Sequence, residues 1–182
     1  MTGTTWTPEH VAAGLGWPEG PALLGDGRLL FVESYRSQLT ALGPDRAPRR
    51  FAYTAGAPNS CVLGGDGAVY VCQNGGTVGP WRAAELTRPS IQRVREGGAA
   101  EILLTSVAGI ALNGPNDLVF CPDGRLVFTD PGTYNPASPD PSYIFAVAQR
   151  RRPLRPAETR RDQFDLKLLA HFTAPAVRPR TM

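Results

Sequence analysis

The sequence predicts an all-β protein made of four-stranded units, the kind of unit that forms the blades of a β-propeller. A spaced pattern occurs three times, beginning at Pro18, Pro58 and Pro115. In each copy an Asp-Gly pair follows the proline by eight and nine residues, and a short apolar segment follows the pair. The 20 Gly and 18 Pro among 182 residues interrupt the chain every few positions. Such punctuation is typical of many short strands joined by turns.

Each copy predicts two strands around its Asp-Gly turn. Asp-Gly favours a tight hairpin because both of its residues tolerate positive φ. The three turns are Asp26-Gly27, Asp66-Gly67 and Asp123-Gly124. The segments that follow them are continuously apolar, as expected for strands buried on both faces, and lie at 29–32, 69–71 and 126–128.

Further strands complete the units. Third strands are predicted at 38–42, 90–94 and 142–147, and fourth strands at 50–54 and 101–105. Four strands per unit, with a step of 40 residues from the first copy to the second, are typical of propeller blades. We therefore expect about three four-stranded blades, at residues 15–55, 56–110 and 111–147. The step to the third copy is 57 residues, and we expect the excess, at 75–89, to form a loop on the mouth of the propeller.

Residues 148–182 form an aberrant C-terminal tail that is basic and rich in Pro and Arg. Two interpretations are open: a partly disordered basic tail, or a reading-frame shift that replaces the native continuation. Residues 149–182 hold 9 basic and 3 acidic side chains, whereas residues 1–148 hold 10 basic and 13 acidic ones. The net charge of +3 therefore reflects the tail and does not indicate a nucleic-acid-binding protein.

No segment predicts a membrane or secretory protein. No apolar run approaches the ~20 residues of a spanning helix, and residues 1–15 lack the basic start and apolar stretch of a signal peptide. We expect no membrane partner and a cytoplasmic location. Cys61, Cys72 and Cys121 lie in apolar runs without a Cys-x-x-Cys pair, which predicts buried thiols in a reducing compartment. A disulfide between two of them is the open alternative.

Two polar positions recur in the three copies. The residue fifteen after the proline has a side chain of a kind that can bind metals, and these residues are Glu33, Gln73 and Asp130. The residue directly after the proline is also polar, and these residues are Glu19, Asn59 and Asn116. If the units stack around an axis, the second set converges on one site.

Local roles are the alternatives at each position. Glu19 could be a solvated loop residue, and Asn59 could cap a turn, as Asn often does. Asp117 could bind a backbone amide of a neighbouring blade. Asp130 could fix the loop between blades together with Pro131.

Four motifs together resemble the gluconolactonase and regucalcin (senescence marker protein) family. The motifs are Trp17-Pro18-Glu19-Gly20-Pro21, Gly56-Ala57-Pro58-Asn59-Ser60, Leu112-Asn113-Gly114-Pro115-Asn116-Asp117 and Phe128-Thr129-Asp130-Pro131. The resemblance covers residues 10–147. It implies a six-bladed β-propeller with one divalent metal on its axis, of which this chain holds the N-terminal half.

The resemblance also implies roles for individual residues. Glu19, Asn116 and Asp117 are expected to bind the metal, most often Ca²⁺, with Zn²⁺ and Mn²⁺ as alternatives. Asn59, Ser60 and Asn116 are expected to contact substrate, and Asp117 is the only local candidate for a general base. Hard cations favour such carboxylate and amide oxygens.

The predicted function is metal-dependent hydrolysis of a sugar-acid lactone, with a small-molecule lactone as partner. The alternative is a catalytically inactive propeller fragment or a binding module without enzymatic activity. Three blades do not close a six-fold ring, so we also expect self-association through exposed blade faces.

Overall fold

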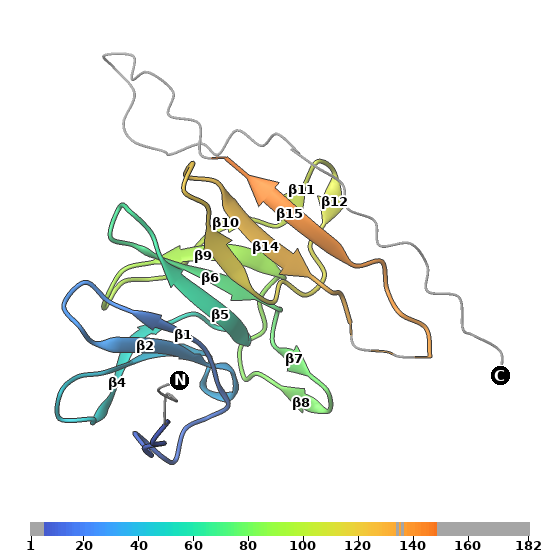
Figure 1. The fold of residues 1–182 in the computed structure, drawn as a ribbon. Helices are drawn as coiled ribbons and strands as arrows, with labels where there is room; N and C mark the ends of the chain where they lie inside the picture. The colour runs from blue at the N-terminus through green and yellow to red at the C-terminus, as the bar shows by residue number, and fades with distance from the viewer. Residues whose placement is uncertain (1–5, 134, 136, 149–182) are drawn as a thin grey trace, which may run out of the picture.

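The structure is a computed structural model that describes residues 6–133, 135 and 137–148 (Figure 1). In these residues the backbone forms antiparallel strands and one 3-10 turn, η1 (Ser34–Arg36). The all-β prediction is confirmed. The prediction for the tail falls, apart from Ala148, outside the described residues. No helix in the described part of the chain is long and apolar enough to cross a membrane.

The first sheet is a simple meander. Its strands, in spatial order, are β1 (Pro18–Leu23), β2 (Leu29–Glu33), β3 (Gln38–Leu42) and β4 (Pro48–Tyr53). A turn forms at Asp26-Gly27 between β1 and β2, where the amide of Gly27 donates to the carbonyl of Leu24 and the carboxylate of Asp26 accepts the amide of Arg28. It is wider than the tight hairpin expected, because strand pairing stops at Leu23 and Leu29 and only Gly27 of the pair has positive φ.

The second sheet repeats this order and carries an inserted hairpin. Its strands, in chain order, are β5 (Pro58–Leu63), β6 (Val69–Gln73), β9 (Ser90–Val94) and β10 (Glu101–Leu104). The segment at 75–89 was expected to be a loop, but part of it pairs as a hairpin of β7 (Thr77–Val78) and β8 (Trp81–Arg82). The Gly79-Pro80 pair between these short strands provides the tight turn that closes them.

The third sheet has three strands in the described part of the chain. They are β13 (Leu118–Phe120), β14 (Leu126–Asp130) and β15 (Tyr143–Val147), preceded by a hairpin of β11 (Ser106–Val107) and β12 (Ile110–Ala111). The predicted third and fourth strands of the units are therefore present where the structure describes them, with ends that differ by one or two residues. Figure 1 shows the three sheets side by side in chain order, from blue to orange.

The second sheet is the centre of the core because both of its faces are covered. Val69 and Val71 of β6 pack with residues of the first sheet such as Leu30 and Val32. Tyr70 and Cys72, which point to the opposite face, pack in a second cluster with residues of the third sheet, among them Leu126, Phe128 and Phe145. Successive side chains of β6 point to opposite faces of the sheet. Because both faces are covered, every residue of its run can be apolar.

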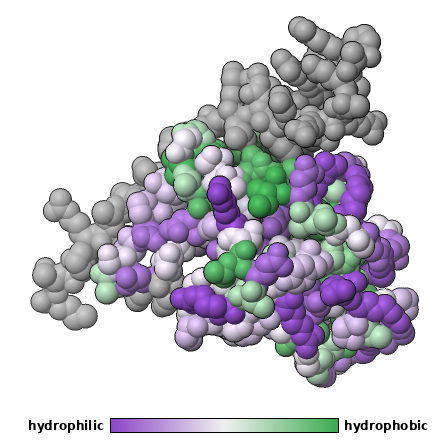
Figure 2. All heavy atoms as spheres, turned by 180° about the vertical axis from the view of Figure 1, so that it is seen from behind, coloured by the Kyte–Doolittle hydropathy of each residue, from purple (hydrophilic) through white to green (hydrophobic). Residues whose placement is uncertain are grey.

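The outer sheets turn apolar side chains away from this core. On the first sheet, Phe31 and Leu42 line a cavity of about 250 Å³ together with Val11 and Leu15 from the segment before β1. On the third sheet, Val119 and Ile144 are 54% and 47% exposed. Figure 2 shows apolar patches interrupted by polar residues on one face of the molecule.

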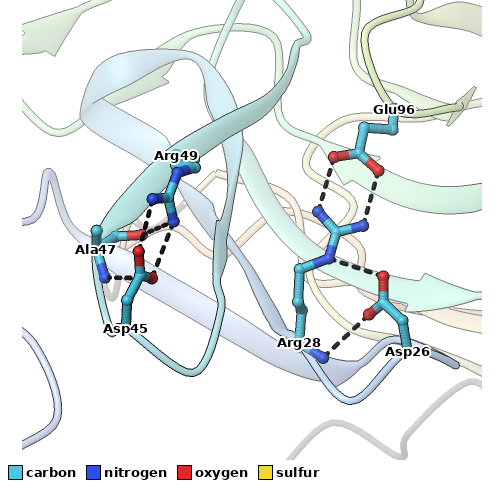
Figure 3. A network of polar contacts seen from close by, with 6 residues as sticks. All are labelled: Asp26, Arg28, Asp45, Ala47, Arg49 and Glu96. Carbon is cyan, nitrogen blue, oxygen red and sulfur yellow. Dashed lines mark hydrogen bonds and ion pairs between the residues drawn. The ribbon is translucent and has the colours of Figure 1, made fainter.

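Ion pairs tie the turns at the ends of the sheets (Figure 3). Arg28 binds Asp26 in its own turn and Glu96 in the turn between β9 and β10, at 2.8 and 2.7 Å. Hydrogen bonds from Arg28 hold the pKa of both carboxyl groups below its usual value. Asp45, paired with Arg49, has its pKa lowered to about 2. The carboxylates of these pairs are exposed, so the pairs contribute little to the free energy of unfolding, and only the bond from Arg28 to Glu96 links two neighbouring turns among the pairs drawn.

The burial of Phe128 predicts the effect of shortening its side chain. Phe128 is 1% exposed between the second and third sheets. Phe128→Ala should lower the free energy of unfolding by about 3–5 kcal/mol, because it removes apolar contacts and leaves a cavity. Val119→Ala, on the exposed face of the same sheet, should change it by no more than about 0.5 kcal/mol. Urea denaturation of both variants measures this difference, and equal losses would contradict the packing described.

Candidate metal and substrate site

The candidate residues lie at one end of the three sheets, which we call the mouth end. It is the end where β1 and β5 begin and where β2, β6 and β14 finish. Pairing of Pro18 with Glu33 and of Pro58 with Gln73 defines it in the first two sheets. In the third sheet, backbone bonds of Asn116 and Asp117 to Thr129 extend the ladder to the same end.

A buried carboxylate anchors the loop that enters the first sheet. Glu33, at the end of β2, has no exposed surface. Its Oε2 accepts the backbone amide of Gly16 at 2.6 Å and pairs with Arg36 at 2.8 Å. Its Oε1 accepts the hydroxyl of Thr40 at 2.5 Å. The loop before β1 is therefore held to the end of β2 by the Glu33 side chain.

The equivalent residues do the same in the other two sheets. Oε1 of Gln73 accepts the amide of Ala57 at 2.7 Å. The carboxylate of Asp130 accepts the amides of Asn113 and Gly114 at 2.9 and 2.7 Å. It also accepts the amide of Gly132 at 3.3 Å, which confirms the expectation that Asp130 fixes the loop between blades. The recurring polar residues that follow each proline by fifteen are thus buried loop anchors.

Three of the candidate site residues form one hydrogen-bonded chain. The side-chain nitrogen Nδ2 of Asn59, on β5, donates to Oδ1 of Asn116. Nδ2 of Asn116 donates to Oδ2 of Asp117 at 3.0 Å. The backbone amide of Asp117 donates to the hydroxyl of Thr129 at 3.1 Å, which fixes the start of β13. Asn59 and Asn116 are half-buried and Asp117 is exposed, so the chain ends at the surface.

Glu19 lies on the neighbouring strand β1, and a glycine sets that strand against β5. Gly20 has φ +53°, and a side-chain carbon there would lie 2.6 Å from Cα of Ser60. The thiol of Cys61 donates to the carbonyl of Gly20 at 3.2 Å. This close approach requires glycine and places Glu19 on the strand beside Asn59.

Two of the predicted residues, Glu19 and Ser60, make no hydrogen bond to Asn59, Asn116 or Asp117 among those that the structure shows. The exposed carboxylate of Glu19 accepts the indole N–H of Trp17 at 3.1 Å. Ser60 is 5% exposed and lies against the backbone of Gly20. The substrate contact expected of Ser60 and the metal contact expected of Glu19 stay predictions.

The three cysteines are free, and Cys61 and Cys72 are buried as small apolar side chains. Cys121 lies in the turn between β13 and β14, away from the mouth end. Burial raises the pKa of Cys61 to about 12. Burial, with the charges of Asp117 and Asp130, raises the pKa of Cys72 well above its usual value. Neither buried thiol is an available nucleophile near neutral pH, because the thiolate is the reactive form.

The donor set at the mouth end suits a hard divalent cation. The described residues bring no three His, Cys, Asp or Glu side chains together. Glu19 and Asp117 supply carboxylate oxygens, and Asn59 and Asn116 supply amide oxygens. Ca²⁺ takes mixed oxygen ligands of this kind, including amide carbonyls. A calcium-type ion therefore fits these residues in ligand type.

A row of three aromatic rings stands beside Glu19 and was not predicted from the sequence. Trp17 and Tyr35 have ring centroids 5.3 Å apart, and Tyr35 and Trp81 have centroids 4.9 Å apart. Trp17 precedes β1, Tyr35 lies in η1 and Trp81 lies in the inserted hairpin. Trp17 has φ +62°, a conformation that costs a bulky residue of order 1–3 kcal/mol.

Comparison with known proteins places the chain in a family. Residues 17–161 match the family described as the SMP-30/Gluconolactonase/LRE-like region. A search of curated proteins found no match. The identification rests on this family match, which covers most of the chain.

Solved structures support the fold. A gluconolactonase from Xanthomonas campestris matches with a TM-score of 0.61 and 24% identity, covering 78% of this chain and 46% of that one. A second protein assigned as a gluconolactonase gives a TM-score of 0.59 and 24% identity, covering 77% and 48%. A virginiamycin B lyase from Staphylococcus aureus gives 0.51 and 18%, covering 73% and 38%. These proteins are β-propellers, and the likeness is one of fold.

The chain spans about half the length of the gluconolactonase structures that it matches.

The loop anchors predict a coupled loss of stability and order. Asp130→Ala removes the acceptor of the backbone amides of Asn113, Gly114 and Gly132, and an unsatisfied buried donor costs about 1–3 kcal/mol. We expect a fall in the free energy of unfolding of that size and a broadened side-chain amide resonance of Asn116. Asp123→Ala, in an exposed turn of the same sheet, should leave the Asn116 resonance unchanged. Urea denaturation and ¹⁵N NMR measure both effects, and identical behaviour of the two variants would contradict the anchor role.

Proposed function

Because the chain belongs to the SMP-30/gluconolactonase/LRE-like family, we propose that its mouth end forms part of a metal-dependent site for hydrolysis of a sugar-acid lactone. The proposed whole is a six-bladed propeller, to which this chain contributes blades at residues 15–55, 56–110 and 111–147. In such a ring the outward faces of the first and third sheets would each be covered by another sheet. Exposure of Val119 and Ile144 supports that part of the proposal, including self-association when no other sheet covers them.

The observation that carries the proposal is the hydrogen-bonded chain of Asn59, Asn116 and Asp117 beside Glu19. We call β1, β5 and the segment that leads into β13 the inner segments. The hydrogen-bonded side chains come from the starts of two of them, and the bond between Asn59 and Asn116 joins residues 57 apart in sequence. Their contact supports a shared ligand, since isolated turn caps would not need to contact one another, and Glu19 lies at the start of the third, neighbouring inner segment. The oxygens they offer are those of a hard-cation site.

Glu19, Asn116 and Asp117 would hold the cation, with Ca²⁺ favoured over Zn²⁺ and Mn²⁺ because no nitrogen or sulfur donor is in the set. When bound, the cation supplies a Lewis acid that polarises the lactone carbonyl. Asn59 and Asn116 orient the substrate through their amide groups, which can both donate and accept.

Asp117 is the proposed general base. Its carboxylate is exposed, so water can reach it, and the bond from Asn116 fixes its direction. In the reaction, water adds to the carbonyl carbon and gives a proton to Asp117. The ring C–O bond then breaks and Asp117 returns the proton to the leaving ring oxygen, which gives the open hydroxy acid and restores the Asp117 carboxylate.

The role of Asp117 predicts a large loss of activity on a conservative change. Asp117→Asn keeps the shape but removes the base, so kcat for glucono-δ-lactone should fall roughly 100-fold or more. Asp123→Asn is the matched control, because Asp123 lies in an exposed turn of the same sheet and binds Arg125. Its kcat should stay within about twofold of the parent protein. A pH-stat assay measures both rates.

Two outcomes of that assay would contradict the role. One is an Asp117→Asn variant as active as the control. The other is a parent protein that hydrolyses no lactone with Ca²⁺, Mn²⁺ or Zn²⁺ present, which would favour the non-catalytic alternative.

The metal site predicts stabilisation by its ion. A ligand at 100 times its Kd stabilises a folded protein by about 2.7 kcal/mol. Ca²⁺ titration should therefore raise Tm of the full chain, and Glu19→Gln should remove most of this shift. Glu101→Gln, an exposed carboxylate on β10, is the control that should keep it. Differential scanning calorimetry makes the measurement, and an equal shift in the two variants would exclude Glu19 as a ligand.

A further inference from the structure

We infer that Trp17, Tyr35 and Trp81 form a subsite that binds a second sugar ring, so that the preferred substrate is the lactone at the end of a disaccharide. This inference rests on the proposed function and specifies its substrate class. We call the three side chains the aromatic row.

The first step is the position of the aromatic row relative to the proposed cation site. Nε1 of Trp17 is 3.1 Å from Oε1 of Glu19. The indole edge thus touches the carboxylate expected to hold the metal. A lactone whose carbonyl lies at that metal would have its outer substituent beside the Trp17 ring. A single sugar ring would fill the metal site, and a linked second ring would reach the aromatic row.

The second step is exposure. Trp17 is 50% exposed and Tyr35 is 39% exposed. Rings that serve only to pack a hairpin onto a sheet gain by being buried. Trp17 ends the row and has one ring neighbour within it, Tyr35, so its second face is not covered by another ring of the row.

The third step is backbone conformation. Trp17 keeps φ at +62°, where glycine or asparagine would be less strained. Strain of this kind persists where the surroundings hold it, and it clusters at ligand sites. The loop that holds it is anchored one residue earlier, through the bond from Gly16 to Glu33.

The fourth step is the chemistry of the occupant. An aromatic face carries partial negative charge and attracts the partially positive C–H bonds on the flat face of a sugar ring. The hydroxyl groups at the edge of that ring need polar neighbours. Arg36, exposed and next to Tyr35 in sequence, pairs with Glu33 and donates to the carbonyl of Gly14, which leaves further N–H groups of its five to supply them. A sugar ring therefore fits better than a wholly apolar group.

The inserted hairpin completes the subsite. Trp81 lies on β8 of the second sheet's insertion, yet its ring contacts Tyr35 of the first sheet. The hairpin thus reaches across the mouth end between two sheets. A chain without the insertion would have Trp17 and Tyr35 but not the third ring.

The test compares kcat/KM for two lactones and uses the ratio of the two values. We expect kcat/KM for cellobiono-δ-lactone to exceed that for glucono-δ-lactone roughly tenfold, mainly through KM, which corresponds to the usual worth of an aromatic contact. In Trp17→Phe the ratio should fall several-fold, and in Tyr35→Leu it should fall to near one. Trp6→Leu is the matched control, because Trp6 is 88% exposed and outside the row. That variant should keep the parent ratio.

A binding measurement separates this inference from the proposed function. Methyl β-cellobioside cannot be hydrolysed as a lactone, so saturation-transfer NMR reports its contact with the aromatic row even if no lactone is turned over. Transfer to its ring C–H protons in the parent protein and the Trp6→Leu control, lost in Tyr35→Leu, supports the subsite. Such transfer without lactone hydrolysis would overturn the proposed function alone.

Three results would overturn the subsite. The first is a ratio near one in the parent protein together with no saturation transfer. The second is a disaccharide preference that persists in both Trp17→Phe and Tyr35→Leu. The third is a stronger preference for dihydrocoumarin, an aromatic lactone, over both sugar lactones, which would assign the row to an aromatic group.

Discussion

The structure depends on one repeated interaction, a buried side-chain acceptor at the end of the second strand that holds the backbone of the entering loop. Glu33, Gln73 and Asp130 perform it in the three sheets. Buried backbone amides need partners, so these contacts are obligatory rather than incidental. Each one fixes the point where an inner segment begins, and the positions of Glu19 and Asn116 follow from that point.

The mouth end therefore combines rigid anchors with exposed polar groups. The anchors use oxygens that are fully buried, whereas Asp117 and Glu19 remain exposed to solvent and available to a ligand. Close packing of β1 on β5 through Gly20 brings two of these inner strands together. Strain at one neighbouring residue, Trp17, is supported by the same anchored loop. Buried anchors and exposed polar groups are thus different side chains of a single repeated pattern.

The strands could be predicted from the sequence because proline, Asp-Gly and apolar runs act locally. The run at β6 even indicated a sheet covered on both faces. The role of Glu33 and Gln73 could not be predicted, because an oxygen that accepts a backbone amide is chemically the same as one that binds a metal. The aromatic row could not be predicted for another reason. The inserted hairpin brings Trp81 to Tyr35, and its strands of two residues each are too short to show an alternating pattern in the sequence.

The central claim is that the starts of the inner segments converge on one cation. Paramagnetic line broadening by Mn²⁺ tests it most directly, because the effect depends on distance to the ion and not on catalysis. The account predicts that the side-chain amide resonances of Asn59 and Asn116 and the indole resonance of Trp17 broaden together at the same low Mn²⁺ concentration. Broadening confined to the Asp-Gly turns at Asp26 and Asp123, with these three resonances unaffected, would contradict it.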